Sequence, residues 1–294
     1  MKYQIQHITG YQYTQSVSIC HNLAHLLPRN YPRQTWLSHE LAIQPAAAVQ
    51  THRTDYFGNP ILYFAIQQSH ESLCVKAAGG VEIARAAAPE HLPDMSWRAI
   101  SEMLHQRRSL MTDPYAFTLP SPAVPITPKL LEFAHDSFNP QATLLQAATD
   151  LMRRIKQDFT FDAASTTIST PIDEVLDRRH GVCQDYAHLA VGCFRCFGLS
   201  ARYVSGYLLT LPPPGRPKII GADASHAWAS IFLPGCGWVD IDPTNNMFVS
   251  DQHIAIACGR DFHDVSPLRG VLLGGHSHRV TVSVDVRAIG LPSP

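Results

Sequence analysis

The sequence predicts an α+β fold, with an N-terminal β-sandwich followed by a domain of helices packed on an antiparallel sheet. Three observations predict it. Residues 1–95 contain short runs of alternating apolar and polar residues, separated by turn signals such as Gly58-Asn59-Pro60, and no convincing helical period. Apolar residues then recur at helical spacing between residues 144 and 197. Strand-like runs joined by tight turns follow the helices, an order that is typical of α+β domains.

The composition is that of a globular protein without a strong charge. The chain has 294 residues and a formal net charge of −1, so no global field attracts nucleic acid or an anionic membrane. No apolar run approaches the roughly 20 residues that span a bilayer, and the N-terminal stretch lacks the apolar core of a signal peptide. The seven cysteines show no framework spacing, which favours a reducing compartment. We therefore expect a cytoplasmic protein with neither nucleic acid nor a membrane as a partner.

Changes in composition divide the chain into two expected domains. Residues 1–95 are expected to form the β-sandwich domain. Residues 96–127 are rich in proline and are expected to form a connecting segment, with one helix around Trp97–Arg107. Residues 128–294 are expected to form the second domain, including a C-terminal strand.

Three helices are expected at the start of the second domain. The first begins near Leu144 and runs to about Phe159, because its apolar residues share one face. The second follows Thr170, which is expected to cap it, with Pro171 in the first helical position. The third opens at Cys183 and ends at Gly198, a good helix terminator.

Strands are expected in the remainder of the chain. The runs are Tyr203–Leu209, His226–Leu233, Trp238–Asp242, Ile254–Ala257 and Val280–Val286. In the last of these, alternate valines share one face and are expected to be buried in a sheet, although the sequence does not indicate which sheet receives them; they are Val280, Val282, Val284 and Val286.

Cys183 is a candidate nucleophile because of its position. At the start of a helix, its sulfur faces free backbone N–H groups and the positive end of the helix dipole, which favour the thiolate. The Cys183 N–H is also suited to stabilising an oxyanion. Taken alone this signal is weak, since a lone cysteine in an apolar segment is more often a small buried hydrophobe.

The strands expected after residue 225 strengthen the case for Cys183 as a nucleophile. By the two-residue period of a strand, His226 and Trp228 point to one face, and Trp238, Asp240 and Asp242 point to one side of the next strand. A hairpin between these strands brings a carboxylate beside the imidazole of His226. Such a carboxylate fixes the tautomer of the ring and stabilises its protonated form, while the other ring nitrogen faces the sulfur.

At these residues the chain resembles the transglutaminase-like superfamily, which shares its core with papain-like cysteine proteases. Four pieces occur in the family's order: Gly181-Val-Cys-Gln-Asp-Tyr-Ala-His-Leu, Ala201-Arg-Tyr-Val-Ser-Gly-Tyr-Leu, Asp223-Ala-Ser-His-Ala-Trp and Gly237-Trp-Val-Asp-Ile-Asp-Pro-Thr-Asn. Further likeness to bacterial transglutaminase-like proteins lies in Tyr3-x-Ile-x-His, Leu27-Pro-Arg, Asp55-Tyr-Phe-Gly-Asn and the segment from Gly259 to Gly270. The resemblance therefore extends over nearly the whole chain.

The resemblance implies a papain-like core with a catalytic triad. It places the nucleophile at Cys183, the base at His226 and the orienting acid at Asp242, which precedes Pro243-Thr244. Asp240 is the competing acid but does not match the motif position. No cofactor and no metal are expected: the Cys193/Cys196 pair is expected to be core packing, and the other ligands that a metal needs beside His180 and His188 are missing.

Three functions are compatible with this triad. The preferred one is a hydrolase that cleaves peptide or isopeptide-like amides through a thioester, because excluding water from an acyl-enzyme requires dedicated construction. The second is a transglutaminase, which passes the acyl group of glutamine to an amine. The third is a binding scaffold with a vestigial site, which the intact triad disfavours. A peptide or protein substrate is expected as the partner, and the oligomeric state is left open.

Overall fold

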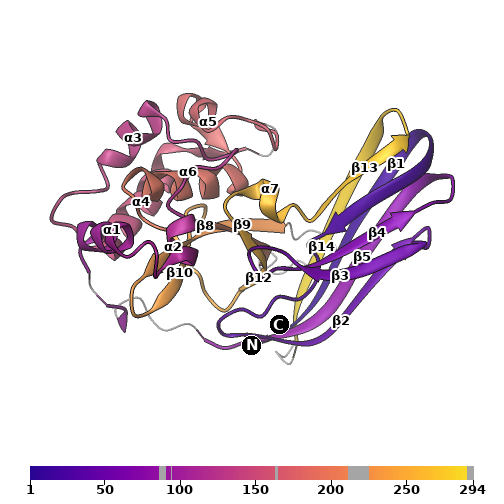
Figure 1. Cartoon of the computed structure of the whole chain (residues 1–294), viewed down its shortest axis with the longest axis horizontal. Coiled ribbons are helices and arrows are strands. Elements are labelled where there is room, and N and C mark those ends of the chain that lie inside the picture. Colours follow the sequence, from indigo (N-terminus) through magenta and orange to yellow (C-terminus); the bar gives the residue numbers. More distant parts are fainter. Residues whose placement is uncertain (86–90, 94, 163–164, 211–224, 290–294) are drawn as a thin grey trace, which may run out of the picture.

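The computed structural model describes residues 1–85, 91–93, 95–162, 165–210 and 225–289. It is a mixed α/β fold in which a long antiparallel sheet stands beside a helical part with a second sheet (Figure 1). The first and last strands pair with each other, from Lys2 opposite Ile289 to Tyr13 opposite His278. Both ends of the described chain therefore lie in the same sheet.

The long sheet is organised around its first strand. Its seven strands follow the order β2-β5-β1-β4-β3, with β13 and β14 also paired to β1. The strand β1 has 23 residues and pairs with β5 and β14 through its first half and with β4 and β13 through its second. The strands are β1 (Lys2–Ala24), β2 (Gln34–Gln44), β3 (Val49–Thr54), β4 (Pro60–Ile66), β5 (His70–Ile83), β13 (Leu268–Gly274) and β14 (His278–Ile289).

The expected β-sandwich is not confirmed. Hydrogen bonds through β1 join all seven strands into one sheet, which curls so that β4 and β5 contribute to the same core. Phe64 of β4 and Val75 of β5 are both fully buried there. A sequence that alternates apolar and polar residues has the same pattern in a curled sheet as in two stacked sheets, because both bury one face of each strand.

The pairing of β14 shows which sheet receives the C-terminal strand, a point that the sequence left open. Although the strand follows residues of the second domain in sequence, β13 and β14 extend the N-terminal sheet. The burial of its valines was predicted only in part. Val284 and Val286 are buried against the second sheet, whereas Val280 and Val282 are 45% and 55% exposed. The last strand is longer than its contact with the second sheet, so its first half faces solvent.

The helical part contains a five-stranded antiparallel sheet in the order β11-β10-β9-β8-β12. Its strands are β8 (Ala201–Leu208), β9 (Ser225–Leu233), β10 (Gly237–Asp242), β11 (Met247–Phe248) and β12 (His253–Gly259). The helices are α1 (Trp97–Gln106), α2 (Thr112–Ala116), α3 (Pro128–His135), α4 (Leu144–Asp158), α5 (Ile172–Arg178), α6 (Cys183–Cys196) and α7 (Phe262–Val265), and a short parallel pair comprises β6 (Thr160–Phe161) and β7 (His180–Gly181). Among the described residues, no helix is long and apolar enough to cross a membrane.

Local signals account for the ends of the three predicted helices. The helix α4 begins with a capping box, in which the side chains of Thr143 and Gln146 bond each other's backbone N–H. The N-cap of α5 is Pro171 itself, so Thr170 does not cap this helix as predicted. Gly198, with a φ of 67°, follows the end of α6, as expected of a terminating glycine.

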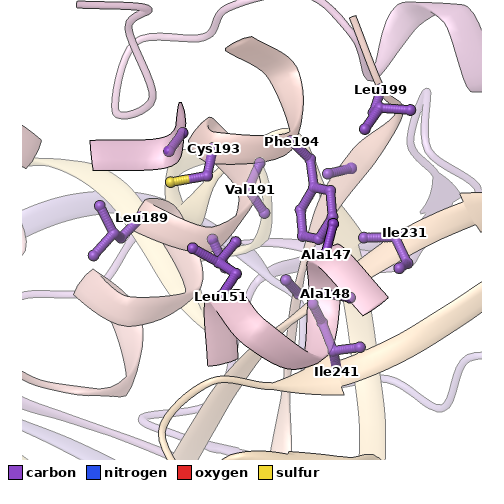
Figure 2. Packing of buried hydrophobic residues seen from close by; sticks show 14 of the residues in the cluster. Ala147, Ala148, Leu151, Leu189, Val191, Cys193, Phe194, Leu199, Ile231 and Ile241 are labelled. Atoms are coloured by element: carbon purple, nitrogen blue, oxygen red, sulfur yellow. The ribbon is translucent and has the colours of Figure 1, made fainter. Parts of the chain in front are cut away.

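The core of this part surrounds α6. Nearly every residue of α6 from Asp185 to Arg195 is buried, and the helix packs against α3, α4 and the strands β8 and β9. Figure 2 shows Leu151 of α4, Phe194 of α6 and Ile231 of β9 within this cluster. Trp97, at the start of α1, packs into the same core, so the proline-rich segment is part of the folded unit. A helix buried on all sides has little freedom to shift, and this fixes the position of its first residue, Cys183.

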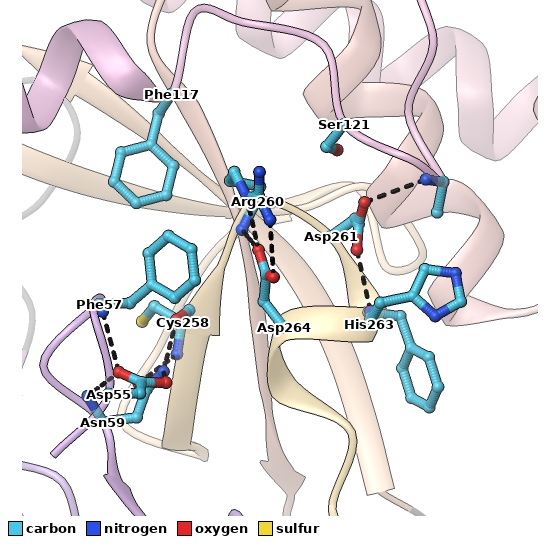
Figure 3. Close-up of polar contacts among 12 residues, drawn as sticks. Asp55, Phe57, Asn59, Phe117, Ser121, Cys258, Arg260, Asp261, His263 and Asp264 are labelled. Carbon is cyan, nitrogen blue, oxygen red and sulfur yellow. Dashed lines mark hydrogen bonds and ion pairs between the residues drawn. The ribbon is translucent and has the colours of Figure 1, made fainter. Parts of the chain in front are cut away.

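Side-chain amides connect the two sheets at the edge strand β12. The amide of Gln34 accepts from the N–H of Ala255 and donates to its carbonyl, with distances of 2.9 and 2.7 Å. The amide of Asn59 does the same at Cys258, with both distances 2.8 Å (Figure 3). Each amide bonds the backbone N–H and carbonyl of β12 as a neighbouring strand would. Backbone groups at the open edge of the sheet are thereby satisfied and protected from pairing with another chain.

Candidate active site

The start of α6 presents Cys183 at the edge of the core. The N-cap is Val182 in an extended conformation, so Cys183 is the first helical residue, as the sequence predicted. Asp185 accepts from the Val182 N–H at 2.8 Å and from the Thr166 hydroxyl at 2.7 Å, which anchors this first turn. Cys183 itself is partly buried and packs against a cluster that includes Tyr203.

The hairpin of β9 and β10 places His226 beside Asp242. The two strands pair in antiparallel register, with Ile241 opposite Ala229, so the start of β9 meets the end of β10. The Nε2 atom of His226 lies 2.8 Å from Oδ2 of Asp242. The structure thus brings the predicted histidine and carboxylate together.

Asp242 is a buried carboxylate that is fully engaged in hydrogen bonds. Its side chain has no solvent exposure. Its Oδ1 accepts from the backbone N–H groups of Thr244 and Asn245, and its Oδ2 accepts from the Asn245 side chain at 2.7 Å as well as from His226. Burial alone raises the pKa of such a group, but the hydrogen bonds from His226, His253 and Asn245 and the charge of His226 hold the pKa of Asp242 far below its ordinary value. The carboxylate is therefore ionised.

His226 lies between this carboxylate and the sulfur. Burial lowers its pKa, but the hydrogen bond to Asp242 and the hydrogen bond to Cys183, together with both of their charges, outweigh burial and raise the pKa of His226 to about 10. Because Nε2 faces Asp242, Nδ1 is the ring nitrogen left for the sulfur. The ring is thus protonated at neutral pH and able to donate a proton next to Cys183.

The competing acid, Asp240, has a different partner. The hydroxyl of Tyr31 donates to both of its carboxylate oxygens, at 2.9 and 2.8 Å. Arg202 in turn donates to the Tyr31 oxygen at 3.1 Å and lies over the ring of Trp238 at 4.2 Å. This group joins the N-terminal part to β10, and it engages Asp240 away from His226.

The sequence did not single out Asn245 or His253 as functional residues. Asn245 lies within the Pro-Thr-Asn run that carried the resemblance, which was the available signal. His253 opens β12, and its Nε2 lies 3.0 Å from Oδ2 of Asp242. No local sequence pattern marks His253, because the fold of the whole segment between β10 and β12 brings it to the site.

The other residues considered near Cys183 differ in their exposure. His180 is exposed, whereas His188 is buried and accepts from the Phe262 N–H at 3.0 Å. Burial lowers the pKa of His188 to about 4, so it is neutral. Trp228 of β9 is buried in a cluster with residues of β8 and β12, and Cys193 is buried in the core.

Among the residues that the structure describes, one group offers atoms suited to a metal ion. His226, Asp242 and His253 have their ligand atoms within 4.8 Å of one another. Here the atoms are joined by hydrogen bonds, and Nδ1 of His253 faces the backbone N–H of Ser250 at 3.4 Å. These hydrogen bonds use the same atoms that a metal ion would take as ligands.

Comparison with known proteins identifies the family of the chain. A model of the bacterial transglutaminase-like N-terminal region matches residues 3–82, and a model of the transglutaminase-like superfamily matches residues 132–243. An uncharacterized protein of Mycobacterium tuberculosis is 39% identical over 306 residues, which cover 97% of this chain and 92% of that protein. The chain belongs to the transglutaminase-like superfamily. The members of this superfamily are typically cysteine-dependent enzymes.

Two further similar proteins extend the comparison. An uncharacterized protein of Mycobacterium leprae is 29% identical over 287 residues, which cover 96% of this chain and 97% of that protein. A crystal structure of a "putative cysteine protease" from Cytophaga hutchinsonii superimposes with a TM-score of 0.78 at 19% identity, covering 100% of this chain and 92% of that one. This similarity shows that the fold is shared with that protein over the whole length of this chain.

Proposed function

We propose that this transglutaminase-like protein is a thiol-dependent hydrolase that acts on peptide or isopeptide-like amides. The observation that carries the proposal is the imidazole of His226, which lies 2.8 Å from the buried carboxylate of Asp242 and whose pKa is raised by both Asp242 and Cys183. Cys183 is the nucleophile, His226 the acid and base, and Asp242 the group that orients the ring. The substrate is a peptide or a protein.

The reaction follows from these positions. The Cys183 thiolate attacks the amide carbonyl, and the oxyanion develops near the backbone N–H groups at the start of α6. His226 gives its proton to the leaving nitrogen as the C–N bond breaks, which leaves a thioester on Cys183. A water molecule then gives a proton to His226 and attacks the thioester. The acid product leaves, and the thiolate and the imidazolium are restored.

A second candidate is transfer of the acyl group to an amine. A protein-glutamine gamma-glutamyltransferase of Pseudomonas aeruginosa is 31% identical over 102 residues, which are 32% of this chain and 15% of that protein. In this reaction a primary amine takes the place of water and leaves an amide product. The same three residues serve both reactions, so the acceptor decides between them.

A peptide library screened by mass spectrometry tests this proposal. The purified chain is incubated with the library, with and without a primary amine, and Cys183→Ala is the control. We expect cleavage or deamidation that persists when the amine is present and is lost in the variant. Amine-adducted glutamines that depend on Cys183 would show a transglutaminase instead. Products that form equally with Cys183→Ala would exclude both reactions at this site.

We also propose that the protein works in the cytoplasm. All seven cysteines are free thiols, and Cys236 is exposed. Exposed free thiols persist most readily in a reducing compartment. Fractionation of cells that express the chain tests the proposal, which recovery of the protein outside the cytoplasmic fraction would exclude.

A further inference from the structure

A second imidazole holds the carboxylate of the candidate triad. His253 opens β12, eleven residues beyond Asp242, and its Nε2 lies 3.0 Å from Oδ2 of Asp242. Neither side chain is exposed to solvent. The same oxygen accepts from Nε2 of His226 at 2.8 Å, so one carboxylate oxygen is shared by two rings whose centroids are 5.9 Å apart.

The contacts of His253 define its role in the hydrogen bond to Asp242. Its Nδ1 lies 3.4 Å from both the backbone nitrogen and the hydroxyl oxygen of Ser250, and its Nε2 faces the Asp242 carboxylate. An ionised carboxylate only accepts hydrogen bonds, so Nε2 of His253 is the donor. His253 therefore donates to the carboxylate that stabilises the His226 cation.

His253 has a specific effect on the orientation of Asp242. The titratable groups that face the carboxylate are His226 and His253, and the side-chain amide of Asn245 and the backbone N–H groups of Thr244 and Asn245 also donate to it. With all of these donors present, the carboxylate has one orientation, in which Oδ2 points at His226. Removal of the His253 ring leaves a gap beside Oδ2, into which water or the carboxylate itself moves, and this weakens the hydrogen bond to His226.

The rest of the fold keeps His253 in place. The ring of Trp228 meets the His253 ring edge-on, with centroids 5.4 Å apart. Two residues further along β12, Ala255 is bonded through both its N–H and its carbonyl to the side chain of Gln34 from the N-terminal part. The N-terminal sheet thus fixes the strand that presents His253 to the site.

We propose that His253 is a positioning residue that acts through Asp242 to hold the imidazolium of His226 against Cys183. The proposal rests on the arrangement of Cys183, His226 and Asp242 proposed above. His253 touches neither the sulfur nor a reacting atom in this account. Its contribution is the hydrogen bond that keeps Oδ2 directed at His226.

The pH profile of Cys183 alkylation by iodoacetamide tests the proposal without a known substrate. At low pH the thiolate exists only as the partner of the imidazolium, whereas at pH 9 a thiol ionises to a large extent without help. For His253→Ala we expect the rate at pH 6 to fall about tenfold and the rate at pH 9 to change less than about twofold. The full chain is used, and peptide mass spectrometry resolves the modified cysteine.

Two variants separate the hydrogen bond from general loss of packing. In His253→Gln the amide nitrogen lies at about the place of Nε2 and donates in the same direction, so we expect the rate at pH 6 to stay within about threefold of the original. The matched control is His7→Ala, which removes a buried imidazole of β1 that bonds Thr9 on the same strand and Tyr207 of β8 and that has no contact with Asp242. This control is expected to retain the original profile.

Each contrary result overturns a defined part of the account. An unchanged rate at pH 6 in His253→Ala would overturn the positioning role, and so would an equal fall in His253→Gln or in His7→Ala. Asp242→Asn distinguishes this failure from failure of the proposed function. If Asp242→Asn slows alkylation at pH 6 and His253→Ala does not, only the role of His253 is lost. If Asp242→Asn also has no effect, the proposed triad itself is wrong.

Discussion

Replacement of His226 by alanine is expected to lower turnover of an amide substrate by about 10⁴-fold or more, as loss of a triad member does in other enzymes. The imidazole has two tasks here, since it stabilises the thiolate and protonates the leaving nitrogen. An alanine does neither, and it leaves the Asp242 carboxylate buried without its cationic partner. The measurement is the single-turnover rate with a peptide found in the library screen.

The control for this substitution is His135→Ala. His135 is the exposed last residue of α3 and lies outside the candidate site. Its removal is expected to leave turnover within about twofold, since exposed substitutions away from special contacts have small effects. A fall of less than tenfold in His226→Ala, in protein shown to be folded by circular dichroism, would contradict the assigned role of His226.

Replacement of Asn59 by alanine is expected to lower the free energy of unfolding by about 2–4 kcal/mol. The amide of Asn59 is fully buried and bonds both the N–H and the carbonyl of Cys258. Alanine removes both hydrogen bonds and leaves two buried backbone groups of an edge strand without partners. Asp55, which accepts from the Asn59 backbone and side chain, loses one of its donors as well.

Urea unfolding measures this effect. The matched control is Asn30→Ala, since Asn30 is an exposed asparagine of the same part of the chain. We expect the control to change the free energy of unfolding by less than about 0.5 kcal/mol. Equal stability of the Asn59 and Asn30 variants would show that the amide contact to β12 contributes little to the fold.

Local sequence patterns were sufficient to predict the helix and the hairpin that carry the candidate triad. The turn before Cys183 and the apolar residues after it predicted the start of α6, because helix signals depend on residues within one or two turns. The two-residue period around the turn at Gly235 predicted the β9–β10 hairpin, and with it the approach of His226 to Asp242. Hairpin partners are close in sequence, so their register follows from the turn.

Long-range pairing was beyond the reach of these patterns. The strand β14 pairs with β1 from the opposite end of the chain, and alternation predicts a strand but not its partner. For the same reason the sequence did not show that Val280 and Val282 face solvent while Val284 is covered. His253 was missed because its contact with Asp242 depends on how the intervening loop folds back to β12.

The most direct test of the central claim is the alkylation of the unmodified chain by iodoacetamide at pH 6, resolved by cysteine. Cys183 is partly buried, whereas Cys236 is exposed and serves as an internal control in the same molecule. If His226 and Asp242 hold Cys183 as a thiolate, we expect Cys183 to react at least about tenfold faster than Cys236 despite its lower exposure. A rate at Cys183 no greater than that at Cys236 would contradict the account and favour a non-catalytic binding scaffold.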